Sequence, residues 1–175
     1  MTATEYVVLV DETDTEIGLA EKITAHQKNL LHRAFSVFIY RKNSGIELLL
    51  QQRALHKYHS PGLWTNTCCS HPRLGEDLVQ AGKRRLFEEL GVSAELQNIG
   101  WFHYNAHFDN GLSENEIDHV LIGKIPEDTN IAHNPDEVHN YRWIGLKELE
   151  SEIAAKPQMF TPWLPLALQK VKAVI

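Results

Sequence analysis

The sequence predicts one compact α/β (α+β) domain, with a mixed β-sheet lying between helices. Short apolar runs rich in β-branched and aromatic residues alternate along the chain with segments of helical character. A length of 175 residues with 43% hydrophobic content suits one domain with a real core. Because no tract rich in Gly, Ser or Pro divides the chain, we expect residues 1–175 to form a single domain.

The strands and helices follow from local composition. The predicted strands are Tyr6–Val10, Ala34–Tyr40, Ile46–Leu50, Ile99–Tyr104, Ile117–Ile125 and Val138–Ile144. A hairpin turn is indicated at Asn43-Ser44-Gly45. The predicted helices are Glu76–Leu90, Leu146–Ala155 and Pro162–Ala173. The first is the best marked, because good helix formers fill it and Gly91 follows it.

Charge and cysteine usage exclude several classes of function. The net charge is −6 and no run of Lys and Arg occurs, so binding along a nucleic-acid backbone is not expected. No signal peptide is recognisable, and no apolar stretch approaches the roughly 20 residues that span a bilayer. The two cysteines, Cys68 and Cys69, are adjacent, which does not suit a disulfide. We therefore predict a cytoplasmic protein.

One group of residues points to chemistry. Cys69 lies two positions before His71, and Glu114 and Glu116 alternate with Asn115. Side chains two apart on a strand face the same side, so both carboxylates can reach one metal ion. A thiol, imidazoles and carboxylates together favour a metal-bound acid/base site. Without the histidines, two exposed carboxylates near a turn would be the better interpretation.

The helix Glu76–Leu90 carries a second pattern. Spacing of four residues pairs Arg84 with Glu88 and Arg85 with Glu89, which alone is typical of a solvated, salt-bridged helix. The ordered residues also resemble the Nudix box, whose glutamates hold divalent cations on a diphosphate: Glu76, Arg84, Leu86, Glu88, Glu89, Gly91 and Val92.

The match to the Nudix box departs at two positions. Ser70 stands where the box has its leading glycine, and Arg85 where it has its first glutamate. Exchanging a carboxylate for a guanidinium removes an anionic metal ligand and adds a cation. This change suits a diphosphate that is held and not cut.

Over nearly its whole length the chain is similar to type I isopentenyl diphosphate isomerases, which have the Nudix fold. The motifs that carry the resemblance are Leu31 to Phe38, Leu50 to Arg53, Trp64 to Pro72, Glu88 to Gly91, Glu114 to Glu116, Pro135 to Val138 and Phe160 to Trp163. The resemblance implies metal-dependent interconversion of isopentenyl and dimethylallyl diphosphate in isoprenoid biosynthesis, by adding a proton to the alkene and removing another.

The resemblance also assigns catalytic roles. Cys69 matches the catalytic cysteine, which leaves Cys68 as a packing residue. Glu116 is the acid or base on the opposite face of the substrate, and Tyr104 matches a tyrosine that assists it. The direction of each proton transfer stays open.

Two metal sites are implied in the same way. The ligand positions of the first fall on His26, His32, His71, Glu114 and Glu116. Mixed imidazole and carboxylate ligands do not identify the ion, and we expect Mn²⁺ or Mg²⁺, with Zn²⁺ as a third candidate. A second cation, Mg²⁺, would join Glu89 to the substrate diphosphate.

The substrate-binding positions are cationic, polar or aromatic. The matching residues are Lys22, Arg53, Lys57, Ser70, Arg85 and Trp163. Arginine can grip two phosphate oxygens at once, and an indole face stabilises a desolvated cation by roughly 2 kcal/mol. Trp163 would therefore face the carbocation.

Two rival functions remain, and both would share the fold. A Nudix pyrophosphohydrolase would need the missing glutamate and would not need Cys69. An inactive diphosphate- or metal-binding module would have no need to keep Cys69, Tyr104 and Glu116. The expected partner is a small allylic or homoallylic diphosphate, with no nucleic acid and no membrane, and the expected state is a monomer or weak homodimer.

Overall fold

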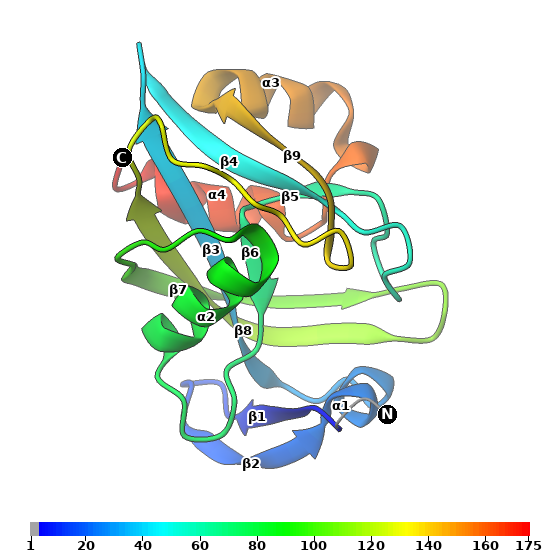
Figure 1. Ribbon diagram of the computed structural model, residues 1–175. Coiled ribbons are helices and arrows are strands. Elements are labelled where there is room, and N and C mark those ends of the chain that lie inside the picture. The colour runs from blue at the N-terminus through cyan, green and yellow to red at the C-terminus, as the bar shows by residue number, and fades with distance from the viewer. Residues whose placement is uncertain (1–3) are drawn as a thin grey trace.

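The computed structural model describes residues 4–175, which form a nine-stranded mixed sheet with helices on both faces (Figure 1). The strands are β1 (Tyr6–Val10), β2 (Glu16–Glu21), β3 (His32–Lys42), β4 (Ile46–Arg53), β5 (Trp64–Thr65), β6 (Cys68–Ser70), β7 (Gln97–His107), β8 (Ser113–Lys124) and β9 (Val138–Gly145). The helices are α1 (Lys22–Gln27), α2 (Leu78–Leu90), α3 (Leu146–Ala155) and α4 (Leu164–Lys172), with a 3₁₀ turn η1 (Pro157–Met159).

Strand β3 organises the sheet. It pairs antiparallel with β1, β4 and β6, and parallel with β8. The other strands attach to these neighbours: β2 to β1, β5 and β9 to β4, and β7 to β8. The β7–β8 pair extends as a long hairpin in Figure 1. The predicted mixed sheet is thus confirmed.

Alternation along the central strands divides the core into two layers. Val37 packs in the layer that contains Leu86 of α2, whereas its neighbour Phe38 packs in the layer that contains Leu149 of α3 and Leu164 of α4. Successive side chains of a strand point to opposite faces of the sheet, so one apolar run supplies both layers. In Figure 1, α2 lies in front of the sheet and α4 behind it.

Helix α2 is fixed at both ends. Asp77 is extended, and its carboxylate accepts a hydrogen bond from the Gln80 backbone N–H at 3.1 Å, as an N-cap does. The helix therefore begins at Leu78, two residues after the predicted start. At the other end Gly91 has φ 65°, and a Cβ there would lie 2.9 Å from the Ala132 carbonyl oxygen. Only glycine fits this position without strain.

The predicted elements occur, several with longer bounds, and the hairpin after β3 closes as the Asn43 N–H donates to the Gly45 carbonyl at 2.9 Å. Strands β3, β4, β7 and β9 contain the predicted ranges, β1 and α3 match theirs, and α4 is shorter. Sequence reasoning missed β2, α1, β5 and β6. Strand β2 lies at the sheet edge with mostly exposed side chains, so it lacks the apolar alternation on which strand prediction depends.

The N-terminal β1–β2 hairpin is held to the sheet by charged contacts. Arg33 of β3 donates to the Asp14 carboxylate at 2.8 Å, and His119 of β8 lies 2.7 Å from the other oxygen of that group. The hairpin leads into α1, which carries Lys22 and His26. None of the helices in the described part of the chain is long and apolar enough to cross a membrane.

Candidate active site

A cavity of about 140 Å³ opens at the end of the sheet where β6, α2 and β8 meet the loop after β4. Most of the predicted site residues line it: Lys22, Arg53, Lys57, Cys69, Ser70, His71, Arg85, Glu89, Glu114, Glu116 and Trp163. The other three, His26, His32 and Tyr104, are buried. Both histidines have rings within 6 Å of the His71 ring, and the Tyr104 ring lies 6.1 Å from that of Trp163.

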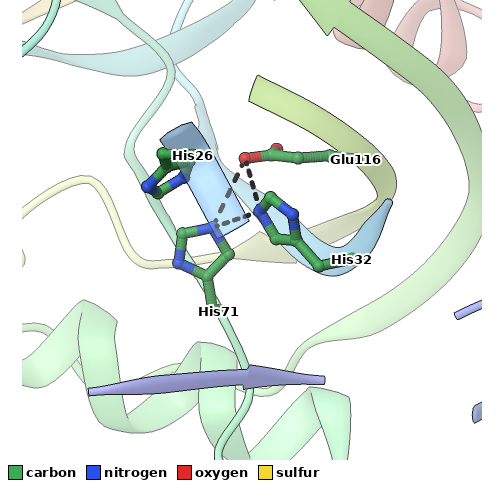
Figure 2. Close-up of side chains that lie close together, drawn as sticks. All are labelled: His26, His32, His71 and Glu116. Atoms are coloured by element: carbon green, nitrogen blue, oxygen red, sulfur yellow. Dashed lines mark hydrogen bonds and ion pairs between the residues drawn. The ribbon is translucent and has the colours of Figure 1, made fainter. Parts of the chain in front are cut away.

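Four of the predicted metal ligands converge. Ligand atoms of His26, His32, His71 and Glu116 all lie within 4.8 Å of one another, and Figure 2 shows their side chains pointing toward one another. His71 Nε2 lies 3.3 Å from Glu116 Oε1 and 3.2 Å from His32 Nε2.

The register of the sheet explains why these residues meet. His32 and Glu116 are direct partners in the parallel pairing of β3 with β8. His71 directly follows β6, which pairs with β3 on its other side. His26 reaches the cluster from α1 and is fully buried.

The electrostatics of the cluster are those of a group that can bind a divalent cation. Burial lowers the pKa of His26 to about 3, so its ring is neutral, and neither ring nitrogen has a partner among the described residues. Burial alone would raise the pKa of Glu116, but hydrogen bonds with His32 and His71 lower it below its usual range. Burial also lowers the pKa of His71. Burial alone would lower the pKa of His32, but its contact with Glu116 raises it. A divalent cation binds an imidazole in its neutral form and a carboxylate in its ionised form. The residues therefore fit the implied metal.

Glu114 is placed differently from the other predicted ligands. Its Oε1 lies 2.7 Å from Nε2 of His59, and both side chains are buried. It lines the cavity on the same strand as Glu116 but does not belong to the group of four. Its role as a ligand stays a prediction.

The two cysteines have different surroundings. Cys68 is fully buried in the layer with α2, which confirms it as a packing residue. Cys69 faces the cavity, where its thiol donates to Asn66 Oδ1 at 3.1 Å and lies 3.5 Å from Ser36 Oγ. Burial raises the pKa of Cys69 to about 12, so the thiol carries its proton at neutral pH.

Two aromatic residues close the apolar side of the site. Tyr104 is the cross-strand neighbour of Glu116, and its hydroxyl has no partner within residues 4–175. Burial raises the pKa of that hydroxyl, which keeps it available as a hydrogen-bond donor. Trp163 is 4% exposed and donates from Nε1 to Asn66 Oδ1 at 3.2 Å. Asn66 thus connects the indole with the Cys69 thiol.

Three cations on the cavity wall are paired with acids. Arg85 Nη2 lies 3.2 Å from Glu89 Oε2 and 3.4 Å from Glu137 Oε2, and Lys57 also pairs with Glu137. Lys22 Nζ lies 2.9 Å from Glu5 Oε2. The predicted pairing of Arg85 with Glu89 is confirmed, as is that of Arg84 with Glu88 at 3.4 Å.

Sequence reasoning assigned no role to several cavity residues, among them His59, Asp118 and Glu137. His59 lies in the loop after β4, where no periodicity marks it. Asp118 continues the alternation of Glu114 and Glu116 and could have been found by extending it. Ser36 donates to the Asp118 carboxylate at 2.9 Å. Burial and the nearby Glu116 raise the pKa of Asp118 well above its usual range.

Comparison with known proteins shows the family to which this chain belongs. Residues 30–164 match the NUDIX domain family. The isopentenyl-diphosphate Delta-isomerase of Photobacterium profundum is 54% identical over 170 residues, covering 95% of this chain and 94% of that protein. The chain belongs to the isopentenyl-diphosphate Delta-isomerases of the Nudix superfamily. An isomerase of the same name from Aliivibrio fischeri (strain MJ11) is 49% identical over 173 residues, covering 96% of this chain and 95% of that protein.

Two solved structures resemble this isomerase family member in fold. A protein from Deinococcus radiodurans has a TM-score of 0.73 at 19% identity and covers 98% of this chain and all of its own. A C. elegans Ap4A hydrolase has a TM-score of 0.58 at 24% identity, with 81% of this chain and 95% of that chain covered. At these identities the likeness concerns the fold, and it confirms the predicted Nudix architecture.

Proposed function

We propose that this protein interconverts isopentenyl diphosphate and dimethylallyl diphosphate. The observation that carries the proposal is the placement of the Cys69 thiol and the Glu116 carboxylate on one cavity, in a chain of this isomerase family. A hydrolase has no use for the thiol. An inactive module has no use for a donor and acceptor that share a cavity with four cationic side chains.

The proton chemistry follows from the residues on the cavity wall. One alkene carbon gains a proton, a tertiary carbocation forms, and a different carbon loses a proton, so the composition of the substrate does not change. Cys69 and Glu116 would serve as the donor and acceptor pair, with their roles exchanged in the reverse direction. Tyr104 would donate a hydrogen bond to Glu116. The buried Trp163 would stabilise the cation and exclude the water that captures it.

The diphosphate would bind among the cations of the cavity wall. Arg53, Lys57 and Arg85 line the cavity together with Lys22 and the Ser70 hydroxyl. Their charges oppose those of the phosphates, and each arginine can grip two oxygens. Glu89 would hold a second Mg²⁺ together with the substrate diphosphate.

The histidine cluster would hold the first divalent cation. His26, His32, His71 and Glu116 supply three nitrogens and an oxygen, and Glu114 is proposed as a further ligand. Mn²⁺ or Mg²⁺ is the proposed ion, with Zn²⁺ as a third candidate. When bound, the cation would supply positive charge beside Glu116 and so hold that carboxylate ionised and fixed. We further propose that the enzyme works in the cytoplasm as a monomer or weak homodimer.

The test is incubation of metal-loaded protein with isopentenyl diphosphate in deuterated water, followed by NMR. Deuterium-labelled dimethylallyl diphosphate, lost on treatment with a chelator, is the expected product. Release of phosphate or of isopentenyl monophosphate would assign the protein to the hydrolases instead. Substrate that binds and stays unchanged would point to an inactive module.

A further inference from the structure

His59 is a buried polar residue that the proposed mechanism does not use. Its side chain is 4% exposed, and its Nε2 lies 2.7 Å from Oε1 of Glu114, whose side chain is 7% exposed. A buried polar contact of this kind is costly to break, because each group loses its partner without regaining water. The pair is therefore a fixed element of the cavity wall.

The surroundings of His59 hold its ring in one orientation. The ring stacks on Phe108 with centroids 4.9 Å apart and planes 11° apart. Tyr58 meets it edge-on at 4.5 Å, and Trp163 does so at 6.0 Å. The His59 backbone carbonyl accepts a hydrogen bond from Arg53 at 3.3 Å. Because both its side chain and its backbone are held, His59 can fix the orientation of the Glu114 carboxylate that it contacts.

The group that His59 contacts borders the histidine cluster. Glu114 lies two residues before Glu116 on β8, so both carboxylates point to the same side. The His59 ring centroid is 6.5 Å from that of His26, a member of the cluster. The contact with His59 occupies Oε1 of Glu114, so the second carboxylate oxygen is the one a cation would take.

We infer that His59 is a positioning residue for the metal site, which orients Glu114 as the fifth ligand beside the cluster of four. This inference rests on the proposed metal site. Carboxylate ligands are commonly hydrogen-bonded from outside the coordination sphere, and loss of such a partner weakens metal affinity by roughly 10- to 100-fold. His59 also contacts a proposed diphosphate-binding residue, because its backbone carbonyl accepts a hydrogen bond from Arg53.

The test is calorimetric titration of the metal-free, full-length protein with Mn²⁺. His59→Ala should weaken Mn²⁺ binding by roughly 10- to 100-fold, and His59→Gln, whose amide N–H can replace the imidazole donor, should bind more tightly than His59→Ala. Ser60→Ala removes the hydroxyl 3.5 Å from the other ring nitrogen and is the matched control, with unchanged affinity expected.

A second measurement distinguishes loss of the Glu114 orientation from a general disturbance of the fold. In a double-mutant cycle, His59→Ala should cost no further Mn²⁺ affinity once Glu114 has been changed to Gln, because the two residues act through one contact. Additive losses, or wild-type affinity in His59→Ala, would overturn the inference. Failure of the wild-type protein itself to bind Mn²⁺ would instead refute the proposed metal site.

Discussion

The histidine cluster is the proposed metal end of the cavity, and the cations Arg85 and Lys57 are the proposed diphosphate end. The two groups satisfy their charges in different ways. At the metal end, the Glu116 carboxylate is surrounded by imidazoles, and the nitrogens of His26 have no partner in the described chain. At the diphosphate end, Arg85 and Lys57 are already paired with acids such as Glu137. A cation at the first end would supply the partner that the His26 nitrogens lack, whereas a diphosphate at the second must displace acids from Arg85 and Lys57. Binding should therefore stabilise the metal end more strongly than the diphosphate end.

The largest effect is expected from a substitution that removes a proton donor and leaves the residues of both ends unchanged. Cys69→Ala should lower turnover by roughly two to four orders of magnitude, because a positioned acid/base group is lost. Mn²⁺ and diphosphate affinity should stay close to wild type. The rate of dimethylallyl diphosphate formation by NMR, with calorimetry for binding, checks both statements.

The neighbouring cysteine is the control for that experiment. Cys68 is fully buried in the core, so Cys68→Ala should lower the melting temperature and retain turnover in the folded fraction. Near-full activity of Cys69→Ala would contradict the two-sided proton transfer.

An intermediate effect is expected at the metal end. His26→Leu removes two buried nitrogens that have no partner among residues 4–175, and each such nitrogen costs about 1–3 kcal/mol when unsatisfied. The metal-free protein should therefore melt at or above the wild-type temperature, while the increase in melting temperature caused by Mn²⁺ should disappear. Thermal unfolding with and without Mn²⁺ measures both quantities.

His32→Leu is the matched comparison. His32 Nδ1 lies 2.8 Å from the Leu30 carbonyl oxygen, so this substitution loses a hydrogen bond as well as a ligand and should destabilise the metal-free protein. If His26→Leu strongly lowered the melting temperature of the metal-free protein, the His26 nitrogens would not be destabilising it. The proposed difference between the metal end and the diphosphate end would then be wrong.

The smallest effect is expected at the diphosphate end. Glu137→Gln removes the acid that Lys57 and Arg85 share. The Glu137 side chain is 29% exposed, so loss of its ion pairs should change the free energy of diphosphate binding by less than about 1 kcal/mol. Calorimetry should therefore show inorganic diphosphate binding only a few-fold more tightly. Glu95→Gln, which loses an ion pair with Lys83 outside the cavity, should change nothing. Weaker binding in Glu137→Gln would mean that the acid positions the cations and does not compete with the ligand.

The sequence predicts the layers of this fold better than its edges. Helix α2 is readable because capping and composition act within a few residues, and Val37 and Phe38 belong to an apolar run long enough to show a strand. The edge strand β2 and the six-residue α1 carry no such periodicity. Their positions depend on contacts such as Asp14 with Arg33, which no local pattern encodes.

The candidate site divides in the same way. Cys69, His71 and Glu116 could be selected because motifs in the chain match a family, and the structure places them on one cavity. His59 could not be selected from the sequence, because its contact with Glu114 joins a loop to a distant strand. Nothing near His59 in the sequence distinguishes it from the other histidines, and only the folded packing shows that it is buried.

The parallel pairing of β3 with β8 has a consequence for the order of folding. His32 and Glu116 become neighbours only when two strands far apart in the chain come into register, and such non-local pairings form slowly because loop closure must come first. The metal site therefore does not exist in an early, locally structured chain. In a refolding experiment, the appearance of metal affinity would mark the moment at which this long-range pairing of β3 with β8 is complete.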